Sequence, residues 1–433
     1  MAVLGAGGLI GAALAEDLAR RGWTLKALAR RLTRAQRAAL GETAIETTFA
    51  RLESAELGWV LASADVVINC VGVLQDGPRG RTDEAHERFV ATLIAALQAR
   101  PEPPLLIHIS IPGAPADDRT AFSRTKRAAE RLIEGSALPY LILRPGFVIA
   151  PAAYGGGALV RALAALPLRI DPALAARPFS VIAIDDLCEA VRRAAELWAS
   201  SWPAGGVAWD AMAPQAVTVA DVVEAFRARF GGPAPRATAP AWLLRTGALG
   251  GDAAAQLGWS PPVRSTALAE MQRGVAGDPS AWMAATGIQP ATLDEALGRL
   301  PATVQEAWYA RLYLLKAAII ACLAAVWVAS GAVALGPGYA AASGFLAAHG
   351  APAGWAGPLT WATALADIGV GAAIAFRRAC RGGLIAGLAL TAAYLAAATL
   401  RAAALWTDPL GPLVKTAPLV LAMLVALAIL PER

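Results

Sequence analysis

A glycine-rich turn at the start of the chain is the feature that most restricts its fold. A short apolar run at residues 2–4 leads into GAGGLIG at residues 5–11, and a helical pattern follows at once at residues 12–21. This order of a strand, a glycine turn and a helix is typical of proteins that bind phosphate groups at the start of a helix. The first apolar run is too short for a signal peptide and lacks a basic start, so we expect it to be a strand.

The glycines within this turn have the spacing GxxGxxG. Gly5, Gly8 and Gly11 permit a sharp turn, a close approach of the backbone to a pyrophosphate and tight packing of helix on strand. Leu9 and Ile10 lie between them, where the first N–H groups of the helix face the phosphate. We therefore predict that Gly5, Gly8, Leu9, Ile10 and Gly11 bind a dinucleotide. A glycine turn that binds no ligand is the alternative.

The charged residues are distributed unevenly. Hydrophobic residues make up 57% of the 433 residues and charged residues only 16%, and nearly all of the charged ones precede Lys316. This asymmetry predicts a soluble front part and a membrane-embedded back part. The net charge of +5 comes without dense basic clusters, so we expect no nucleic-acid partner. The cysteines form no CxxC pair and the histidines lie far apart in sequence, so we expect neither disulfides nor a metal site.

Strand and helix patterns alternate through the front part. Strand patterns lie at residues 23–29, 44–49, 63–73, 105–110 and 140–149, and helical patterns at 84–100, 118–135 and 217–230. Such alternation predicts an α/β fold with a doubly wound parallel sheet of the Rossmann type. We expect a nucleotide-binding domain with elements of a substrate lobe at 1–232, a linker (233–240) with the helical remainder of that lobe up to 305, and a transmembrane four-helix bundle at 306–433.

Two arginines follow the second predicted strand. In a dinucleotide fold this is the position that reads the adenosine ribose. Arg30 and Arg31 offer planar donors to a 2′-phosphate, so NADP(H) is the expected cofactor, with NAD(H) as the alternative. The strand at 63–73 ends at Gly72, where backbone can pass close to the cofactor. A solvated basic loop is the other interpretation of the two arginines.

The ordered set of segments resembles the short-chain dehydrogenase/reductase superfamily. It is most similar to the extended or atypical branch, with NAD(P)-dependent epimerase/dehydratase-like proteins and the nucleotide-binding accessory subunit of respiratory complex I. The resemblance covers about the first two hundred residues. The pieces that carry it are GAGGLIG (5–11), ADVVINCVGVL (64–74), IHISIPGA (107–114), FSRTK (122–126), LRPGFVIAP (143–151) and VIAIDDLCEAV (181–191).

This resemblance implies roles for several further residues. Ser110 matches the family's catalytic serine or threonine, and Lys126 matches the lysine of the YxxxK motif, which holds the nicotinamide ribose. Pro145, Gly146 and Phe147 would lie beside the nicotinamide. A serine that satisfies local backbone groups and a lysine on a helix surface are the alternatives for the first two.

One position departs from the family pattern. The tyrosine of YxxxK is Phe122 in this chain, and a phenyl ring has no proton to transfer. Loss of a positioned acid or base typically costs about 10²–10⁴-fold in rate. Either another group or water replaces it, or the domain binds cofactor without ordinary turnover. Tyr154, in a glycine-rich loop, is a weak substitute and is expected to be a packing residue.

The back part contains segments long enough to span a bilayer. They lie at about 312–335, 358–376, 384–404 and 412–430. The loop after the first span has no Lys or Arg, whereas the loop after the second holds Arg377, Arg378 and Arg381. The distribution of basic residues predicts a multi-pass protein of a bacterial-type inner membrane, with the N-terminal domain and the C-terminus in the cytoplasm.

This half resembles the DoxX-like family of small four-helix membrane proteins. The matching pieces are AVWVASGAVALGPG (325–338), the span that contains Asp367, and LAAATLRAAALWTDPLGPLVKTAP (395–418). The family is linked to respiratory or redox membrane assemblies. Asp367 lies mid-span, and we predict that it pairs with Arg401 or Lys415 and lines a polar cavity. A purely structural ion pair or snorkelling end charges are the alternatives.

Two functions remain open from the sequence. The first is a membrane-anchored NADP(H)-dependent oxidoreductase or epimerase-like enzyme that acts on a lipophilic substrate such as a quinone or a lipid. The second is a catalytically weak nucleotide-binding sensor or assembly factor for a membrane redox complex, which Phe122 favours. A nucleotide-regulated transporter would need a more polar pore than the spans provide.

Overall fold

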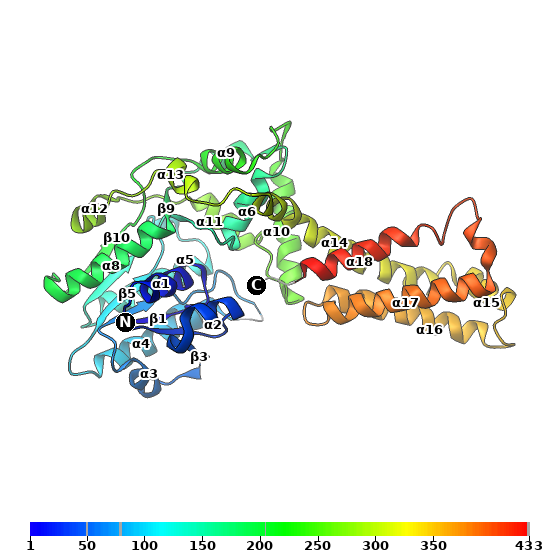
Figure 1. Cartoon of the computed structure of the whole chain (residues 1–433), viewed down its shortest axis with the longest axis horizontal. Helices are drawn as coiled ribbons and strands as arrows, with labels where there is room; N and C mark the ends of the chain where they lie inside the picture. The colour runs from blue at the N-terminus through cyan, green and yellow to red at the C-terminus, as the bar shows by residue number, and fades with distance from the viewer. Residues whose placement is uncertain (49–50, 78–79, 204, 431–433) are drawn as a thin grey trace. The chain divides into compact units, whose positions relative to one another are not determined.

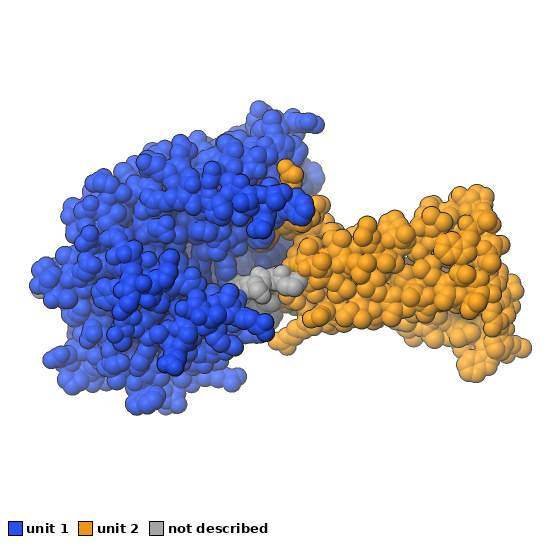
Figure 2. Space-filling view, viewed as in Figure 1, with its two compact units in different colours: residues 1–253, 260–310 blue, residues 254–259, 311–433 orange. Residues whose placement is uncertain are grey.

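The chain forms two compact units. The computed structural model describes residues 1–48, 51–77, 80–203 and 205–430. Unit 1 comprises Met1–Ala253 and Ser260–Ala310, and unit 2 comprises Ala254–Trp259 and Arg311–Arg433, shown in separate colours in Figure 2.

Unit 1 is built on a seven-stranded parallel sheet with the order β10-β6-β5-β4-β1-β2-β3. Figure 1 shows helices such as α1 (Leu9–Arg20) and α8 (Ile184–Ser200) beside this sheet. Its strands are β1 (Ala2–Leu4), β2 (Lys26–Ala29), β3 (Ala44–Glu46), β4 (Val66–Asn69), β5 (Leu105–Ile109), β6 (Tyr140–Leu143) and β10 (Gly206–Trp209). The doubly wound Rossmann-type sheet is thereby confirmed. Residue 49, the last of the strand predicted at 44–49, lies outside the described residues. Strand β10 was not predicted, because the sequence pattern loosens after residue 152.

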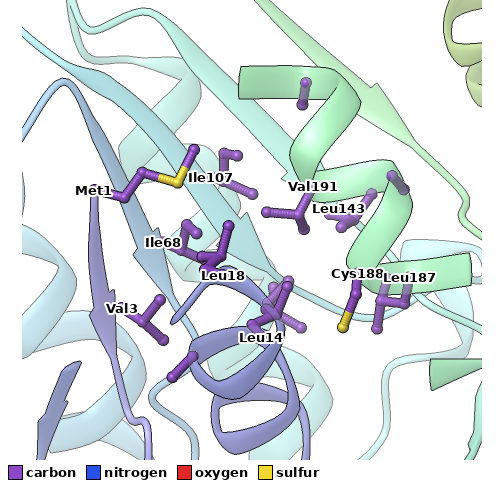
Figure 3. Packing of buried hydrophobic residues seen from close by; sticks show 14 of the residues in the cluster. Met1, Val3, Leu14, Leu18, Ile68, Ile107, Leu143, Leu187, Cys188 and Val191 are labelled. Atoms are coloured by element: carbon purple, nitrogen blue, oxygen red, sulfur yellow. The ribbon is translucent and has the colours of Figure 1, made fainter. Parts of the chain in front are cut away.

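Side chains alternate between the two faces of the sheet, as the strand period of two requires. Val3 and Ile68 belong to the apolar core on one face, which Figure 3 shows with Leu14 and Val191. Leu4 and Val67 belong to the core on the other face. The first core includes residues of α1 and α8; the second includes α3 (Ser54–Leu61), α4 (Phe89–Gln98) and α5 (Ala121–Glu134). Both faces are covered, so the strands read as continuous apolar runs.

Unit 1 also has a smaller lobe with its own apolar core, which contains Phe179, Val181 and Phe226. The stretch predicted as a linker at 233–240 carries β11, which pairs with β8. The helices and strands not yet given, apart from those of the helical unit 2, are α2 (Arg34–Leu40), β7 (Phe147–Ile149), α6 (Gly155–Ala164), β8 (Leu168–Arg169), α7 (Pro172–Ala175), β9 (Val181–Ala183), α9 (Val219–Phe230), β11 (Ala237–Thr238), α10 (Ala241–Gln256), α11 (Ser265–Arg273), α12 (Ser280–Thr286) and α13 (Leu293–Gly298).

Unit 2 is helical. Among the described residues, three helices are long and apolar enough to cross a membrane: α14 (Val304–Leu335), α16 (Ala356–Ala375) and α17 (Cys380–Arg401). The fourth predicted span is the shorter apolar helix α18 (Thr416–Ile429), and the loop predicted at 336–357 contains α15 (Tyr339–Ala348). Large apolar side chains such as Trp361 and Leu365 point outward, which suits contact with lipid rather than water.

Glycines bring the helices of unit 2 into close contact. A Cβ at Gly371 of α16 would lie 2.8 Å from the carbonyl oxygen of Ala324 in α14, and one at Gly331 of α14 would overlap the carbonyl oxygen of Ala364. Small residues at helix contacts are typical of membrane bundles, because apolar burial alone does not drive helices together in lipid.

Several contacts lie at one end of this bundle. The indole of Trp259 donates to the carbonyl of Ala375 at 2.7 Å, and the guanidinium of Arg377 lies over its ring, 5.3 Å from the centroid. At the same end, Lys316 in the first half of α14 donates to the carbonyl of Leu430 at 3.3 Å. One end of the bundle therefore contains the segment 254–259, the end of α18 and the segment with Arg377, Arg378 and Arg381, called here the arginine loop.

Candidate functional site

The predicted phosphate turn lies between β1 and α1, at the carboxyl edge of the parallel sheet. Gly5 has φ +87°, a conformation that L side chains rarely adopt. A Cβ at Gly11 would overlap the Gly5 carbonyl oxygen, and one at Gly7 would lie 2.7 Å from the carbonyl oxygen of Arg31. These three glycines are therefore needed to form the turn. The importance of Gly7 was not predicted, although its position next to Gly8 was a visible signal.

Gly8 differs from the other glycines of the turn. It has ordinary φ, −86°, and a Cβ there would have no neighbour closer than 3.4 Å. It is the N-cap of α1 and no side chain caps the helix. The N–H groups of Leu9, Ile10 and Gly11 have no partner within the helix, by helix geometry. This uncapped N-terminus fits the pyrophosphate of a dinucleotide.

The next strand places both predicted arginines near the turn. Arg30 and Arg31 follow β2 directly, and both side chains are exposed. The guanidinium of Arg30 lies 3.9 Å from the position of a Cβ at Gly80, in the loop after β4. Arg31 is close enough to Glu46 to contribute to lowering the pKa of that carboxyl, although hydrogen bonds from Leu32 and Arg37 have larger effects. Arg30 thus lies beside the loop after β4, whereas Arg31 lies near Glu46.

Gly72 and Lys126 come together at the carboxyl edge of the sheet. The Lys126 ammonium donates to the carbonyl of Ile109 at 2.8 Å and lies 3.7 Å from the position of a Cβ at Gly72. Burial lowers the pKa of Lys126 to about 8, and the nearby Cys70 and Glu130 oppose this shift. Lys126 is therefore buried at this edge of the sheet and is not a surface lysine, and any side chain at Gly72 would contact it.

A histidine that the sequence analysis did not single out lies beside Phe122. The rings of His86 and Phe122 meet edge to face, with centroids 5.6 Å apart. His86 accepts from the backbone N–H of Val73 through Nε2 at 3.1 Å, so its proton is on Nδ1, which lies 2.8 Å from the Thr125 hydroxyl. Burial, and next the charge of Lys126, lowers the pKa of His86 to about 2. Both ring nitrogens are occupied, so His86 does not replace the missing tyrosine as an acid.

Ser110 follows β5 at the same edge and is buried. It lies near the Glu130 carboxylate and contributes to lowering the pKa of that carboxyl. Burial by itself would raise the pKa of Glu130, but Arg144 and Arg127 bind the carboxylate at 2.8 and 3.0 Å and lower it. Glu130 lies one helical turn beyond Lys126, a spacing of four that the sequence displayed.

The last predicted cofactor residues link the sheet to the smaller lobe. Pro145 and Gly146 connect β6 to β7, and both are buried. A Cβ at Gly146 would lie 2.8 Å from the carbonyl oxygen of Ser180. The ring of Phe147 packs on Phe179, with centroids 4.7 Å apart. These contacts fix the connection between sheet and lobe. Tyr154 lies further along, as the N-cap of α6.

The predicted pairing of Asp367 is not found. Among the described residues its carboxylate accepts from Ser330 at 2.7 Å and from Tyr394 at 2.9 Å, and no ion pair joins it to Arg401 or Lys415. Asp367 and Arg401 do line a common cavity. The spacing of charges along the sequence did not reveal which helices present hydroxyl groups to the carboxylate. Over the part of the chain that the structure describes, no group of three or more His, Cys, Asp or Glu residues is arranged to hold a metal ion.

Two family models match this chain. Residues 5–163 match the model of an NAD(P)H-binding family, and residues 324–424 match that of the DoxX-like family. A search of curated proteins found no match.

Solved structures with similar folds carry nicotinamide dinucleotides. The human epimerase family protein SDR39U1 (isoform 2), solved with NADPH, is 20% identical, covers 69% of this chain and 99% of its own, and has a TM-score of 0.51. The UDP-glucuronic acid 4-epimerase of Bacillus cereus, solved with UDP-glucuronic acid and NAD, is 16% identical, covers 72% of this chain and 100% of its own, and also has a TM-score of 0.51. At such identities the likeness shows the fold alone. The chain therefore joins an NAD(P)H-binding domain, with the Rossmann-type fold of epimerase and short-chain dehydrogenase/reductase structures, to a DoxX-like domain with candidate membrane helices.

Proposed function

We propose that the protein is a membrane-anchored NADP(H)-dependent oxidoreductase that reduces a lipophilic, conjugated acceptor of the quinone class. The observation that carries this proposal is the environment of Phe122. It has no hydroxyl, and the neighbouring His86 has both nitrogens committed to Val73 and Thr125. The position of the family's proton donor therefore holds no acid.

The lack of an acid at this position favours one class of substrate. When bound, the dinucleotide supplies a hydride, so NADPH, a quinone and one proton yield NADP⁺ and a hydroquinone. The charge left on a reduced quinone is delocalised over its ring, and water can supply the proton. Reduction of an isolated ketone, or epimerisation at a sugar carbon through a hydroxyl, places the charge on one oxygen and depends on a positioned acid or base. Phe122 thus argues against the epimerase-like chemistry.

The residues at the carboxyl edge of the sheet can hold the cofactor without that acid. The uncapped start of α1 offers N–H groups to the pyrophosphate, and Lys126, which lies beside Gly72, would hold the nicotinamide ribose. Arg30 would bind the 2′-phosphate of NADP(H). Ser110 would orient the acceptor oxygen.

The DoxX-like domain supports a lipophilic substrate, because a bilayer concentrates such molecules. The arginine loop shares its end of the bundle with segment 254–259 and the end of α18. By the distribution of basic residues, we assign this end and unit 1 to the cytoplasm, where NADPH is available.

The experiment uses full-length protein purified in detergent. NADPH and NADH are titrated by fluorescence, and absorbance at the NADPH band is then followed after addition of short-chain ubiquinone and menaquinone analogues. Tight NADPH binding with turnover supports the proposal. Tight binding without turnover of any quinone supports the alternative of a nucleotide sensor or an assembly factor for a membrane redox complex. Binding of neither nucleotide contradicts both.

A further inference from the structure

Unit 2 contains a cavity of about 530 Å³ that the nucleotide-binding role does not use. Its walls come from α14 to α18 and are mostly apolar, with residues such as Val326, Leu359 and Leu395. A cavity of this size and character suits a small lipophilic molecule. The polar side chains on its wall determine which class of lipophilic molecule it can bind.

Asp367 presents a carboxylate to this cavity. It lies near the middle of α16 and is only 6% exposed. Ser330 donates to one carboxylate oxygen at 2.7 Å and Tyr394 to the other at 2.9 Å. A carboxylate has about four acceptor positions, and the contacts among the described residues use two of them. An ionisable group at such depth is costly in a membrane unless its remaining positions are satisfied.

Trp327 supplies the complementary group. It also lines the cavity and is 4% exposed. Its indole N–H has no hydrogen-bond partner in the part of the chain that the structure describes. A buried donor of this kind is uncommon in folded proteins, because leaving it unpaired costs the hydrogen bond that water would have made.

The cavity wall therefore carries an acceptor with spare positions and an unpaired donor. We propose that it binds a lipophilic molecule that ends in a hydroxyl group, of the alkylphenol or hydroquinone class. The hydroxyl hydrogen is donated to Asp367, and its oxygen accepts from the Trp327 indole. A methyl ether of the same molecule has no hydrogen to donate. This inference rests on unit 2 alone and does not depend on turnover by the nucleotide-binding unit.

The test compares two probes of nearly identical shape on the full-length protein in phosphatidylcholine nanodiscs. Binding of radiolabelled 4-nonylphenol is measured by scintillation proximity, and unlabelled 4-nonylphenol or its methyl ether is added as competitor. We expect the ether to compete about tenfold less well than the phenol, the effect of one lost hydrogen bond to a charged group. Equal competition by the two compounds overturns the proposal.

Variants locate the site. Asp367→Asn is expected to weaken phenol binding by about fivefold while ether binding stays unchanged. Trp327→Phe is expected to weaken the binding of both compounds by about fivefold, because the ether oxygen can also accept from the indole N–H. Asp408→Asn and Trp361→Phe are the matched controls, because neither residue lines the cavity. If Asp367→Asn does not fold, Trp327→Phe alone tests the proposal, because phenylalanine keeps an aromatic ring but has no N–H group. Phenol binding that is unchanged in Trp327→Phe contradicts the assignment.

Discussion

The rings of Phe122 and His86 lie edge to face, with their planes inclined by 72°. This contact occupies the position at which the short-chain dehydrogenase/reductase motif has a phenol. The imidazole is held from its other sides by Val73 and Thr125, so it is a packing and hydrogen-bonding partner and not a proton donor. The chemistry of the candidate site follows from this arrangement.

Restoring the phenol tests that chemistry. Phe122→Tyr is expected to leave quinone reduction within about threefold of the original rate and to raise reduction of a simple ketone by at least about tenfold, because only the ketone needs a positioned acid. Initial rates of NADPH oxidation with each acceptor measure this. An equal gain on both acceptors would show that the quinone reaction also lacks a proton donor.

The lowered pKa of Lys126 predicts how NADPH binding depends on pH. The pKa of the free protein's Lys126 is about 8, and the negative charges of bound NADPH raise it, so binding is strongest where the lysine is protonated. Affinity is therefore highest below pH 8 and falls by about tenfold per pH unit above it until the pKa of the complex is reached. Fluorescence titrations between pH 6 and pH 9.5 measure the profile.

A pair of variants separates this effect from others. Lys126→Met should bind weakly with a flat profile over this range, whereas Arg124→Met, on the exposed side of the same helix, should keep the original one. A sloping profile in Lys126→Met would assign the titration to another group.

Two glycines of the turn should respond differently to alanine. Gly11→Ala forces a Cβ against the Gly5 carbonyl and should destabilise unit 1 by about 1–3 kcal/mol, as overpacking does. Gly8→Ala meets nothing closer than 3.4 Å, so its folding should be unchanged while NADPH affinity falls by about tenfold or more. Thermal unfolding and NADPH titration of both variants check this. Normal NADPH binding by Gly8→Ala would mean that the pyrophosphate lies elsewhere.

Arg30 is expected to determine the choice of nucleotide. Arg30→Ser removes the planar donor proposed for the 2′-phosphate, and should weaken NADPH binding by about 10–100-fold with little change for NADH. Arg31→Ser is the control, because that side chain lies near Glu46. The ratio of the two dissociation constants is the measurement. A ratio that changes only in Arg31→Ser would move the role to the second arginine.

Glu130 holds two guanidinium groups in the interior of unit 1. Glu130→Gln leaves Arg127 and Arg144 without their shared carboxylate, and should lower the free energy of unfolding by about 3–5 kcal/mol. Glu134→Gln, one turn further and exposed, should have little effect. The midpoint of thermal unfolding of the full-length protein compares them.

Protonation of Glu130 should also make the folded protein less stable at low pH. Because the pKa of Glu130 is below its usual value, its stabilisation is present above about pH 4.5 and is lost as the pH falls through the pKa of the folded state. The original protein and Glu130→Gln should therefore converge in stability at low pH. A constant difference between them down to pH 3 would show that Glu130 is not the group responsible.

The sequence by itself determined the local features of this protein. The spacing of Gly5, Gly8 and Gly11, the alternation of apolar strands with helices, and the spans after Lys316 each follow from periods of a few residues, which a sequence displays directly. The positions of Lys126 and Phe122, four residues apart on one helix, could be read in the same way. Strand β10 could not, because the sequence after residue 152 lacks a clear strand pattern and only its pairing with β6 in the structure reveals it.

Only the tertiary structure decided which distant residues meet. It placed His86 on Phe122 and tied both imidazole nitrogens to Val73 and Thr125. It also gave Asp367 the hydroxyl groups of Ser330 and Tyr394 in place of the expected cation. Hydrogen bonds and ring contacts act over a few ångströms in space, and the packing of whole helices, which no short sequence window contains, sets which side chains come within that range.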